Sequence, residues 1–209
     1  MCASALSSAF CPRLAFLATP KTGSTAIAAA LESLAAVSIQ RPPVLKHTTV
    51  HRFRRFSAPI CRPPRRNWTL VALMRDPRDW LGSWYRFRQR EETPSDKSTR
   101  SLSFDDFVRA WCRDPRPDFA DVGSQERFLR PRQGQGVDRL FRYEEIDTFV
   151  HFLEDRLGCE IILPRLNVSP PGLTDLTPAT EACARSQVLA PTLSRFTRPC
   201  RRSDPRRAR

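Results

Sequence analysis

Two short apolar segments, each followed by a polar loop and a helical pattern, constrain the fold of this 209-residue chain more than any other feature. The first runs from Leu14 to Ala18, and an Ala-rich and Leu-rich stretch follows from Thr25 to Val37. The second runs from Trp68 to Met74, and a helical pattern follows from Trp80 to about Arg90. Continuous apolar runs of this length are typical of strands buried in a parallel sheet.

The rest of the chain continues the alternation of strands and helices. Ser103-Phe-Asp-Asp106 resembles a capping box and predicts a helix that ends near Trp111. Val137 to Tyr143 has the alternation of a strand, and Glu145 to Leu157 is expected to be a helix stopped by Gly158. The Pro-rich stretch from Gln40 to Arg66 is expected to be irregular or only briefly helical. The pattern predicts a single α/β domain, a three-layer sandwich with a mostly parallel central sheet.

The charge is unevenly distributed along the sequence. Thirty-five basic residues against 22 acidic ones give a net charge of +13, which invites a nucleic-acid interpretation. The surplus lies in two segments, Arg52 to Arg66 and Ala184 to Arg209, and the remainder of the chain is balanced. Since a nucleic-acid interface would be spread over a folded face, we expect no nucleic-acid partner. We interpret Ala184 to Arg209 as a solvated tail with no second domain.

Cysteine usage and apolar runs bear on the cellular compartment. The seven Cys include no C-x-x-C pair, which argues against a zinc knuckle and a disulfide framework and favours a reducing cytoplasm. No apolar run approaches the roughly 20 residues that span a bilayer. The stretch from Met1 to Ala18 has no basic start and is broken by Pro12 and Arg13, so we expect no signal peptide.

The segment Pro20-Lys-Thr-Gly-Ser-Thr25 lies where the first strand gives way to a helix. Backbone N–H groups and the positive end of a helix dipole converge at such a point and can hold an anion. Gly23 permits a tight turn, Ser24 and Thr25 add hydroxyl groups, and Lys21 adds a positive charge. It is not a Walker loop, which needs a second Gly and a later Lys. An ordinary N-capped helix explains this segment, taken alone, equally well.

A second candidate anion site follows the second strand. Arg75 stands at the end of the strand, and Ser83 lies eight residues later, about two helical turns on. Ligands of α/β proteins bind at such strand ends, and a planar guanidinium suits a bidentate phosphate contact. Taken alone, this segment is better explained as a surface pair of Arg75 with Asp76 and a Ser83 that faces a neighbouring helix.

The two segments together resemble the sulfotransferases that use 3′-phosphoadenosine 5′-phosphosulfate (PAPS). Leu140 to Ile146 looks like the strand and acidic turn of that family, and Leu163 to Ser169 is similar to a segment of its bacterial-type members, so the resemblance covers about Leu14 to Ser169. It implies a P-loop-like nucleotide-binding fold over residues 14–183 and a sulfuryl transfer that requires no metal. It implies that the 5′-phosphosulfate is held by the first segment and the 3′-phosphate by the second. The residues assigned in this way are Lys21, Thr22, Gly23, Ser24 and Thr25 for the first role, and Arg75 and Ser83 for the second.

The acceptor, a hydroxyl or an amine such as that of a carbohydrate, must lose a proton to a base with a pKa near neutrality. We favour His47 as the base, with His51 second, because family members supply theirs from this region. Lys21 is expected to neutralise the bridging oxygen of the leaving group. The sequence leaves the acceptor and the oligomeric state open. A nucleotide-binding relative without catalysis and a P-loop-type kinase remain alternatives, because the C-terminus departs from the family pattern.

Overall fold

A parallel three-stranded sheet forms the centre of the computed structural model, which describes residues 14–57, 68–129, 136–166 and 175–188. The strands are β1 (Leu14–Leu17), β2 (Thr69–Met74) and β3 (Arg139–Arg142), in the order β1-β2-β3. In register, Leu14 pairs with Thr69, and Val71 pairs with Arg139. The prediction of an α/β fold with a parallel sheet is confirmed.

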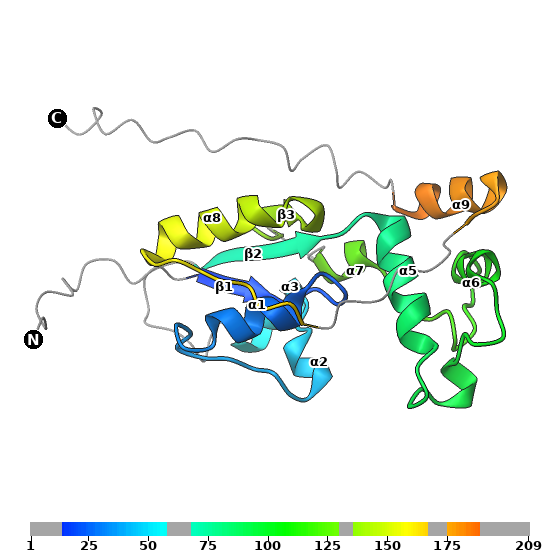
Figure 1. Cartoon of the computed structure of the whole chain (residues 1–209), viewed down its shortest axis with the longest axis horizontal. Coiled ribbons are helices and arrows are strands. Elements are labelled where there is room, and N and C mark those ends of the chain that lie inside the picture. Colours follow the sequence, from blue (N-terminus) through cyan, green and yellow to red (C-terminus); the bar gives the residue numbers. More distant parts are fainter. Residues whose placement is uncertain (1–13, 58–67, 130–135, 167–174, 189–209) are drawn as a thin grey trace, which may run out of the picture.

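Helices cover both faces of this sheet because the side chains of β2 alternate between two apolar clusters. Val71 and Leu73 pack with α1 (Ser24–Leu31) and α8 (Ile146–Leu157). Leu70, Ala72 and Met74 pack on the opposite face with α3 (Val50–Arg52) and α7 (Gln125–Leu129). The arrangement gives three layers, with the central strand buried on both sides (Figure 1).

A third apolar cluster lies beyond the carboxyl ends of the strands. Figure 1 shows α5 (Pro77–Arg88), α6 (Phe104–Trp111) and α9 (Pro178–Val188) gathered past the arrowhead of β2. Their shared core contains the buried residues Trp80, Leu81, Phe104, Phe107, Val108, Ala110, Trp111, Ala120 and Ala184. We call α5, α6 and α9 the helical cluster. The site described below lies where this cluster meets the sheet.

Local capping signals explain several element boundaries. Ser103 Oγ accepts a hydrogen bond from Asp106 N–H at 3.1 Å and starts α6 as predicted. Gly158 has a left-handed φ of 69° and ends α8 as predicted. Helix α5 begins at Pro77, three residues before the predicted start, because the Asp76 carboxylate accepts hydrogen bonds from the first free N–H groups.

Helix α1 ends at Leu31 and does not continue to Val37 as predicted. Beyond Leu31 the apolar side chains meet no partner, since Leu34 is 47% exposed and Val37 is 65% exposed. A short helix without a buried face is not stable by itself. The Pro-rich stretch is irregular with brief helices over residues 40–57, as predicted, and residues 58–67 lie outside the described part. The remaining short helices are α2 (Pro43–Lys46), η1 (Phe53–Ser57), η2 (Ser95–Lys97) and η3 (Tyr143–Glu145).

Helix α9 crosses the expected boundary between domain and tail. It runs through residue 184, and Ala184 is buried in the core of the helical cluster. The tail expected from Ala184 therefore cannot begin before the end of α9, and residues 189–209 lie outside the described part. Residues 1–13 also lie outside the described part, and they include most of the stretch from Met1 to Ala18 for which no signal peptide is expected. Among the described helices, none has the length and apolar character needed to cross a membrane.

Candidate functional site

The first loop (residues 18–23) joins β1 to α1 through two residues in the left-handed region. Lys21 has a φ of 64° and Gly23 a φ of 68°. A side chain at Gly23 would also collide, because a Cβ there would lie 2.8 Å from Cε2 of Tyr143. The loop therefore needs glycine at this position, and Lys21 holds a conformation that L-residues avoid. Such backbone strain clusters at functional sites.

Two hydrogen bonds hold the first loop in this shape. Thr22 Oγ1 donates to the carbonyl oxygen of Thr19 at 2.9 Å, and the Trp80 indole N–H donates to the carbonyl oxygen of Pro20 at 3.0 Å. Thr22 and Ser24 are buried. Trp80 comes from α5 and belongs to the core of the helical cluster. Its second task, fixing the first loop, was not predicted.

The N-terminus of α1 carries no side-chain cap. Gly23 occupies the N-cap position, and the first turn contains no acidic residue. The first N–H groups of a helix have no partner within the helix, and an anion can satisfy them. This geometry supports an anion site at Gly23, Ser24 and Thr25 and disfavours the alternative of an ordinarily capped helix.

Lys46 adds a positive charge to this site that the sequence analysis missed. Its Nζ donates to Thr25 Oγ1 at 3.1 Å. The residue comes from α2, which is 21 positions away in the sequence. In the sequence, the one indication of this role was that Lys46 directly precedes the candidate base His47.

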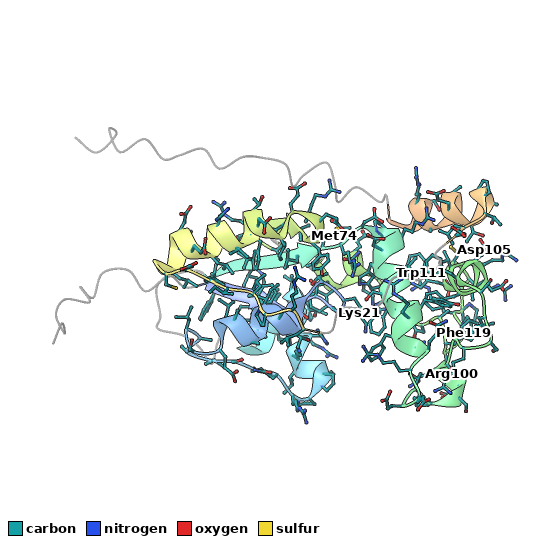
Figure 2. The ribbon with its side chains drawn as sticks, in the orientation of Figure 1. Lys21, Met74, Arg100, Asp105, Trp111 and Phe119 are labelled. Atoms are coloured by element: carbon teal, nitrogen blue, oxygen red, sulfur yellow. The ribbon has the colours of Figure 1, made fainter. Side chains whose placement is uncertain are left out.

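The side chain of Lys21 lies on the aromatic face of α5. Its Nζ stands 3.2 Å from the centre of the Phe87 ring and 4.6 Å from that of Trp84. Burial, followed by the charges of Arg90 and Arg88, lowers the pKa of Lys21 to about 7. Aromatic rings favour the charged amine, so here burial and like charges outweigh them. Lys21 lies between the strand ends and α5 (Figure 2). With a pKa of about 7, its amine is divided between the charged and the neutral form near neutral pH.

His47 lies against the end of β1. Its Nδ1 is 2.7 Å from the carbonyl oxygen of Ala18. A carbonyl oxygen can only accept, so Nδ1 carries the proton and Nε2 is left as the basic nitrogen. Burial is the main cause that lowers the pKa of His47; the bond to Ala18 acts the other way, and Lys46 and Lys21 lower it further. The imidazole is consequently neutral near pH 7.

The second histidine candidate has a weaker connection to the first loop. His51 lies in α3, one turn further along, and is partly buried. Within the described part of the chain, no hydrogen bond joins it to the first loop. Of the two histidines, the structure therefore joins His47 to the first loop by a hydrogen bond, and which of them serves as a base stays a prediction.

The second loop (Arg75 and Asp76) joins β2 to α5 and is held from three sides. The side-chain amide of Gln125 accepts from Arg75 N–H and donates to the Arg75 carbonyl, both at 2.8 Å. The Arg75 guanidinium lies 4.8 Å from the Tyr143 ring, and its Nη1 is 3.5 Å from the carbonyl oxygen of Lys21. The Asp76 N–H donates to a carboxylate oxygen of Glu144 at 2.7 Å. Arg75 thus lies beside the first loop, and Gln125 and Tyr143 are positioning residues that the sequence analysis missed.

Ser83 is buried in α5, with 6% of its surface exposed. In the described part of the chain, no hydrogen bond joins it to Arg75. The surface pair of Arg75 with Asp76, the alternative weighed for this segment, is not formed among the described residues, because Asp76 instead caps α5. Of the predicted residues, Lys21 to Thr25, His47 and Arg75 therefore lie together, and Ser83 lies on the adjoining helix.

Several buried polar atoms of the two loops and of α5 have no hydrogen-bond partner among the residues that the structure describes. They are Thr19 Oγ1, Arg75 Nε, Trp84 Nε1 and Arg86 Nε. A buried donor without a partner is costly, and in native proteins it usually contacts a water or an ion. Thr19 and Arg75 follow β1 and β2, and Trp84 and Arg86 belong to α5, and donors without partners are the groups that a bound anion satisfies. The apolar cavity lined by Met74, Trp80, Trp111 and Gln125 contains none of the predicted site residues.

The comparisons with known proteins do not extend this description. A search against protein-family models and a search of curated proteins both find no match to this chain.

Proposed function

We propose that this chain is a PAPS-dependent sulfotransferase with a P-loop-like nucleotide-binding fold. The observation that carries the proposal is the convergence of two loops at the ends of adjacent parallel strands. One loop leads into a helix N-terminus without a side-chain cap, and the other presents the partly buried Arg75, whose Nε is shielded from solvent. The spacing of the two sequence motifs supports the same function.

In this proposal the first loop holds the 5′-phosphosulfate of the donor. The N–H groups at Gly23, Ser24 and Thr25 and the Lys46 ammonium supply the positive potential. Arg75 and Ser83 hold the 3′-phosphate. The unpartnered Arg75 Nε fits this role, because a phosphate oxygen would satisfy it.

The transfer step moves a sulfuryl group from a phosphate oxygen to an acceptor oxygen or nitrogen. The acceptor attacks sulfur, its proton passes to His47 Nε2, and the bond between sulfur and the bridging oxygen breaks. Adenosine 3′,5′-bisphosphate leaves with the electron pair of that bond. Such transfers depend on positioning and on neutralising the leaving oxygen.

Lys21 supplies the charge for the leaving oxygen in this step. Its amine must turn from the Phe87 ring toward the first loop, which its four-carbon side chain can reach. A pKa of about 7 lets it gain a proton when an anion arrives. Catalysis and donor binding then share one residue.

Calorimetry with adenosine 3′,5′-bisphosphate, followed by transfer of labelled sulfate from PAPS to a panel of acceptors, tests the proposal. The protein should bind the bisphosphate and label at least one acceptor. Lys21→Ala should abolish transfer and keep the fold, whereas Lys97→Ala, an exposed lysine in η2, should behave as the wild type. Binding without any transfer would support the alternative of a noncatalytic relative, and ATP turnover would support the kinase alternative. Absence of bisphosphate binding would overturn the proposal.

A further inference from the structure

The end of α5 carries two arginines whose surroundings differ. Arg88 donates to the carbonyl oxygens of Asp118 and Asp121, so its guanidinium is used to hold the chain together. For Arg86 no hydrogen bond to a described residue is found, and its Nε is buried without a partner. Within the described part of the chain, the fold therefore uses the guanidinium of Arg88 and leaves Nε of Arg86 without an acceptor.

Arg86 lies on the same side of α5 as Ser83 and close to Arg75. Residues three apart on a helix are neighbours on its surface, which places Arg86 beside Ser83. Burial, followed by the nearby charge of Arg75, lowers the pKa of the Arg86 guanidinium, and Asp79 acts in the opposite direction. The charge of Arg75 therefore acts on Arg86, and it opposes the charge that the Arg86 guanidinium carries.

Both members of this arginine pair have the same unsatisfied atom. Arg75 Nε and Arg86 Nε are buried donors that find no acceptor among the described residues, and Ser83 is a buried hydroxyl residue between them along the chain. Bringing two like charges together with unused donors costs stability, and an anion between them would remove both costs. A phosphate monoester carries about two negative charges at neutral pH and several acceptor oxygens, which matches two guanidinium groups.

We infer that Arg86 is a second phosphate-binding arginine, which with Arg75 and Ser83 forms a pocket for the 3′-phosphate of the nucleotide. The inference rests on the proposed function and deepens it, because it assigns to Arg86 the selection of nucleotides that carry a 3′-phosphate. A nucleotide without a 3′-phosphate leaves the positive charges of Arg75 and Arg86 without a counter-charge.

Calorimetry that compares adenosine 3′,5′-bisphosphate with adenosine 5′-monophosphate separates this role from others. The wild type should bind the bisphosphate more tightly. Arg86→Gln should weaken bisphosphate binding on the order of 10- to 100-fold and leave binding of the monophosphate unchanged. Arg86→Lys should lie between them, since it keeps the charge and loses the planar donor pair. Arg156→Gln, which removes the same charge from an exposed position at the far end of α8, is the matched control and should behave as the wild type.

Thermal stability gives a readout that a structural role would not produce. If Arg86 serves binding, removing one of two repelling charges should leave the melting temperature of the free protein unchanged or higher. A lower melting temperature for Arg86→Gln, with an equal loss of affinity for both nucleotides, would assign Arg86 to the fold and overturn the inference.

The two proposals fail in different ways. Equal affinity of the wild type for both nucleotides would overturn the 3′-phosphate pocket and leave the first loop as a nucleotide site. Selective bisphosphate binding that depends on Arg86, without sulfate transfer, would support the pocket and overturn the transferase. Absence of binding to both nucleotides would overturn both.

Discussion

The two loops that follow β1 and β2 offer different chemical groups to an anion, backbone N–H groups in the first and a side chain in the second. The first loop leads into a helix whose N-terminus has no side-chain cap and no acidic residue, so its backbone N–H groups are available. The second loop leads into a helix already capped by Asp76, with Asp79 in its first turn. An anion at the second loop must therefore be held by side chains, and Arg75 is the one that the fold fixes there.

This difference shows two ways of building a phosphate site at one edge of a sheet. The first loop depends on backbone conformation, with left-handed residues at Lys21 and Gly23. The second depends on contacts from distant elements, with Gln125 on its backbone and Tyr143 beside its guanidinium. Substitutions should therefore damage the first loop through backbone strain and the second through loss of long-range support.

Among the changes that compare the two loops, removing the base bound to the first loop should have the largest effect. We expect His47→Gln to lower the rate of sulfate transfer roughly 100- to 10,000-fold, as general base catalysis contributes that much, while bisphosphate affinity stays unchanged. The wild-type rate should rise with pH through a pKa below the ordinary value of 6.5, since only neutral His47 accepts a proton, and this rise should vanish in the variant. His151→Gln, at an exposed position of α8, is the control. A His47→Gln enzyme with wild-type kcat would contradict the assignment.

Changing the backbone of the first loop should have the next largest effect. Gly23→Ala forces an L-residue to a φ of 68° and brings a Cβ to 2.8 Å from the Tyr143 ring. We expect bisphosphate affinity to fall on the order of 100-fold, because small displacements of binding groups cost that much. Gly158→Ala has nearly the same φ, 69°, but open space around its Cβ. It should lower stability by about 1 kcal/mol and leave calorimetric affinity intact; equal binding losses in both variants would refute the comparison.

Removing the support of the second loop should have a moderate effect. Gln125→Met deletes both hydrogen bonds to the Arg75 backbone, and we expect a loss of stability of about 2 kcal/mol in urea unfolding. Bisphosphate affinity should fall about ten-fold and affinity for adenosine 5′-monophosphate much less. Gln125→Glu, which still accepts from the Arg75 N–H, should lie between Gln125→Met and the wild type. Unchanged affinity in Gln125→Met would show that Arg75 needs no such support.

The charge of Lys21 should produce the smallest effect, a pH dependence of binding at the first loop. With a pKa of about 7, Lys21 is charged at pH 6 and neutral at pH 8. Since the charged form attracts the anion, bisphosphate affinity should fall by up to about ten-fold between these values, relative to a Lys21→Arg variant that stays charged. If the calorimetric affinities of the wild type and of Lys21→Arg change with pH in the same way, Lys21 does not change its charge between pH 6 and pH 8 and the prediction is wrong.

The sequence predicted those parts of the structure that are encoded by neighbouring residues. Ser103 and Gly158 mark helix ends through hydrogen bonds and backbone angles within a few positions, so both were recognisable. Helix α9 was missed because Ala184 is the one buried apolar side chain among residues 178–186, where burial is described, and Thr177 before it is held by hydrogen bonds to Asp105. No apolar period marks such a helix.

The candidate site likewise has a part that the sequence predicted and a part that it did not. The residues of the first loop are consecutive in the chain, so they were recognisable as a motif. The contacts of Lys46 with Thr25, Gln125 with Arg75 and Trp80 with Pro20 span 21, 50 and 60 positions. Which distant side chain reaches a loop depends on how the helices pack, and a single sequence does not reveal this.

Trp80 belongs to two parts of the molecule at once. Its ring is in the core with α6 and α9, and its N–H holds the carbonyl of Pro20 in the first loop. Opening of the helical cluster must therefore release the loop, and a ligand on the loop must oppose that opening. The amide hydrogens of α6 and α9, which need not touch a nucleotide, should then exchange with solvent more slowly when one is bound.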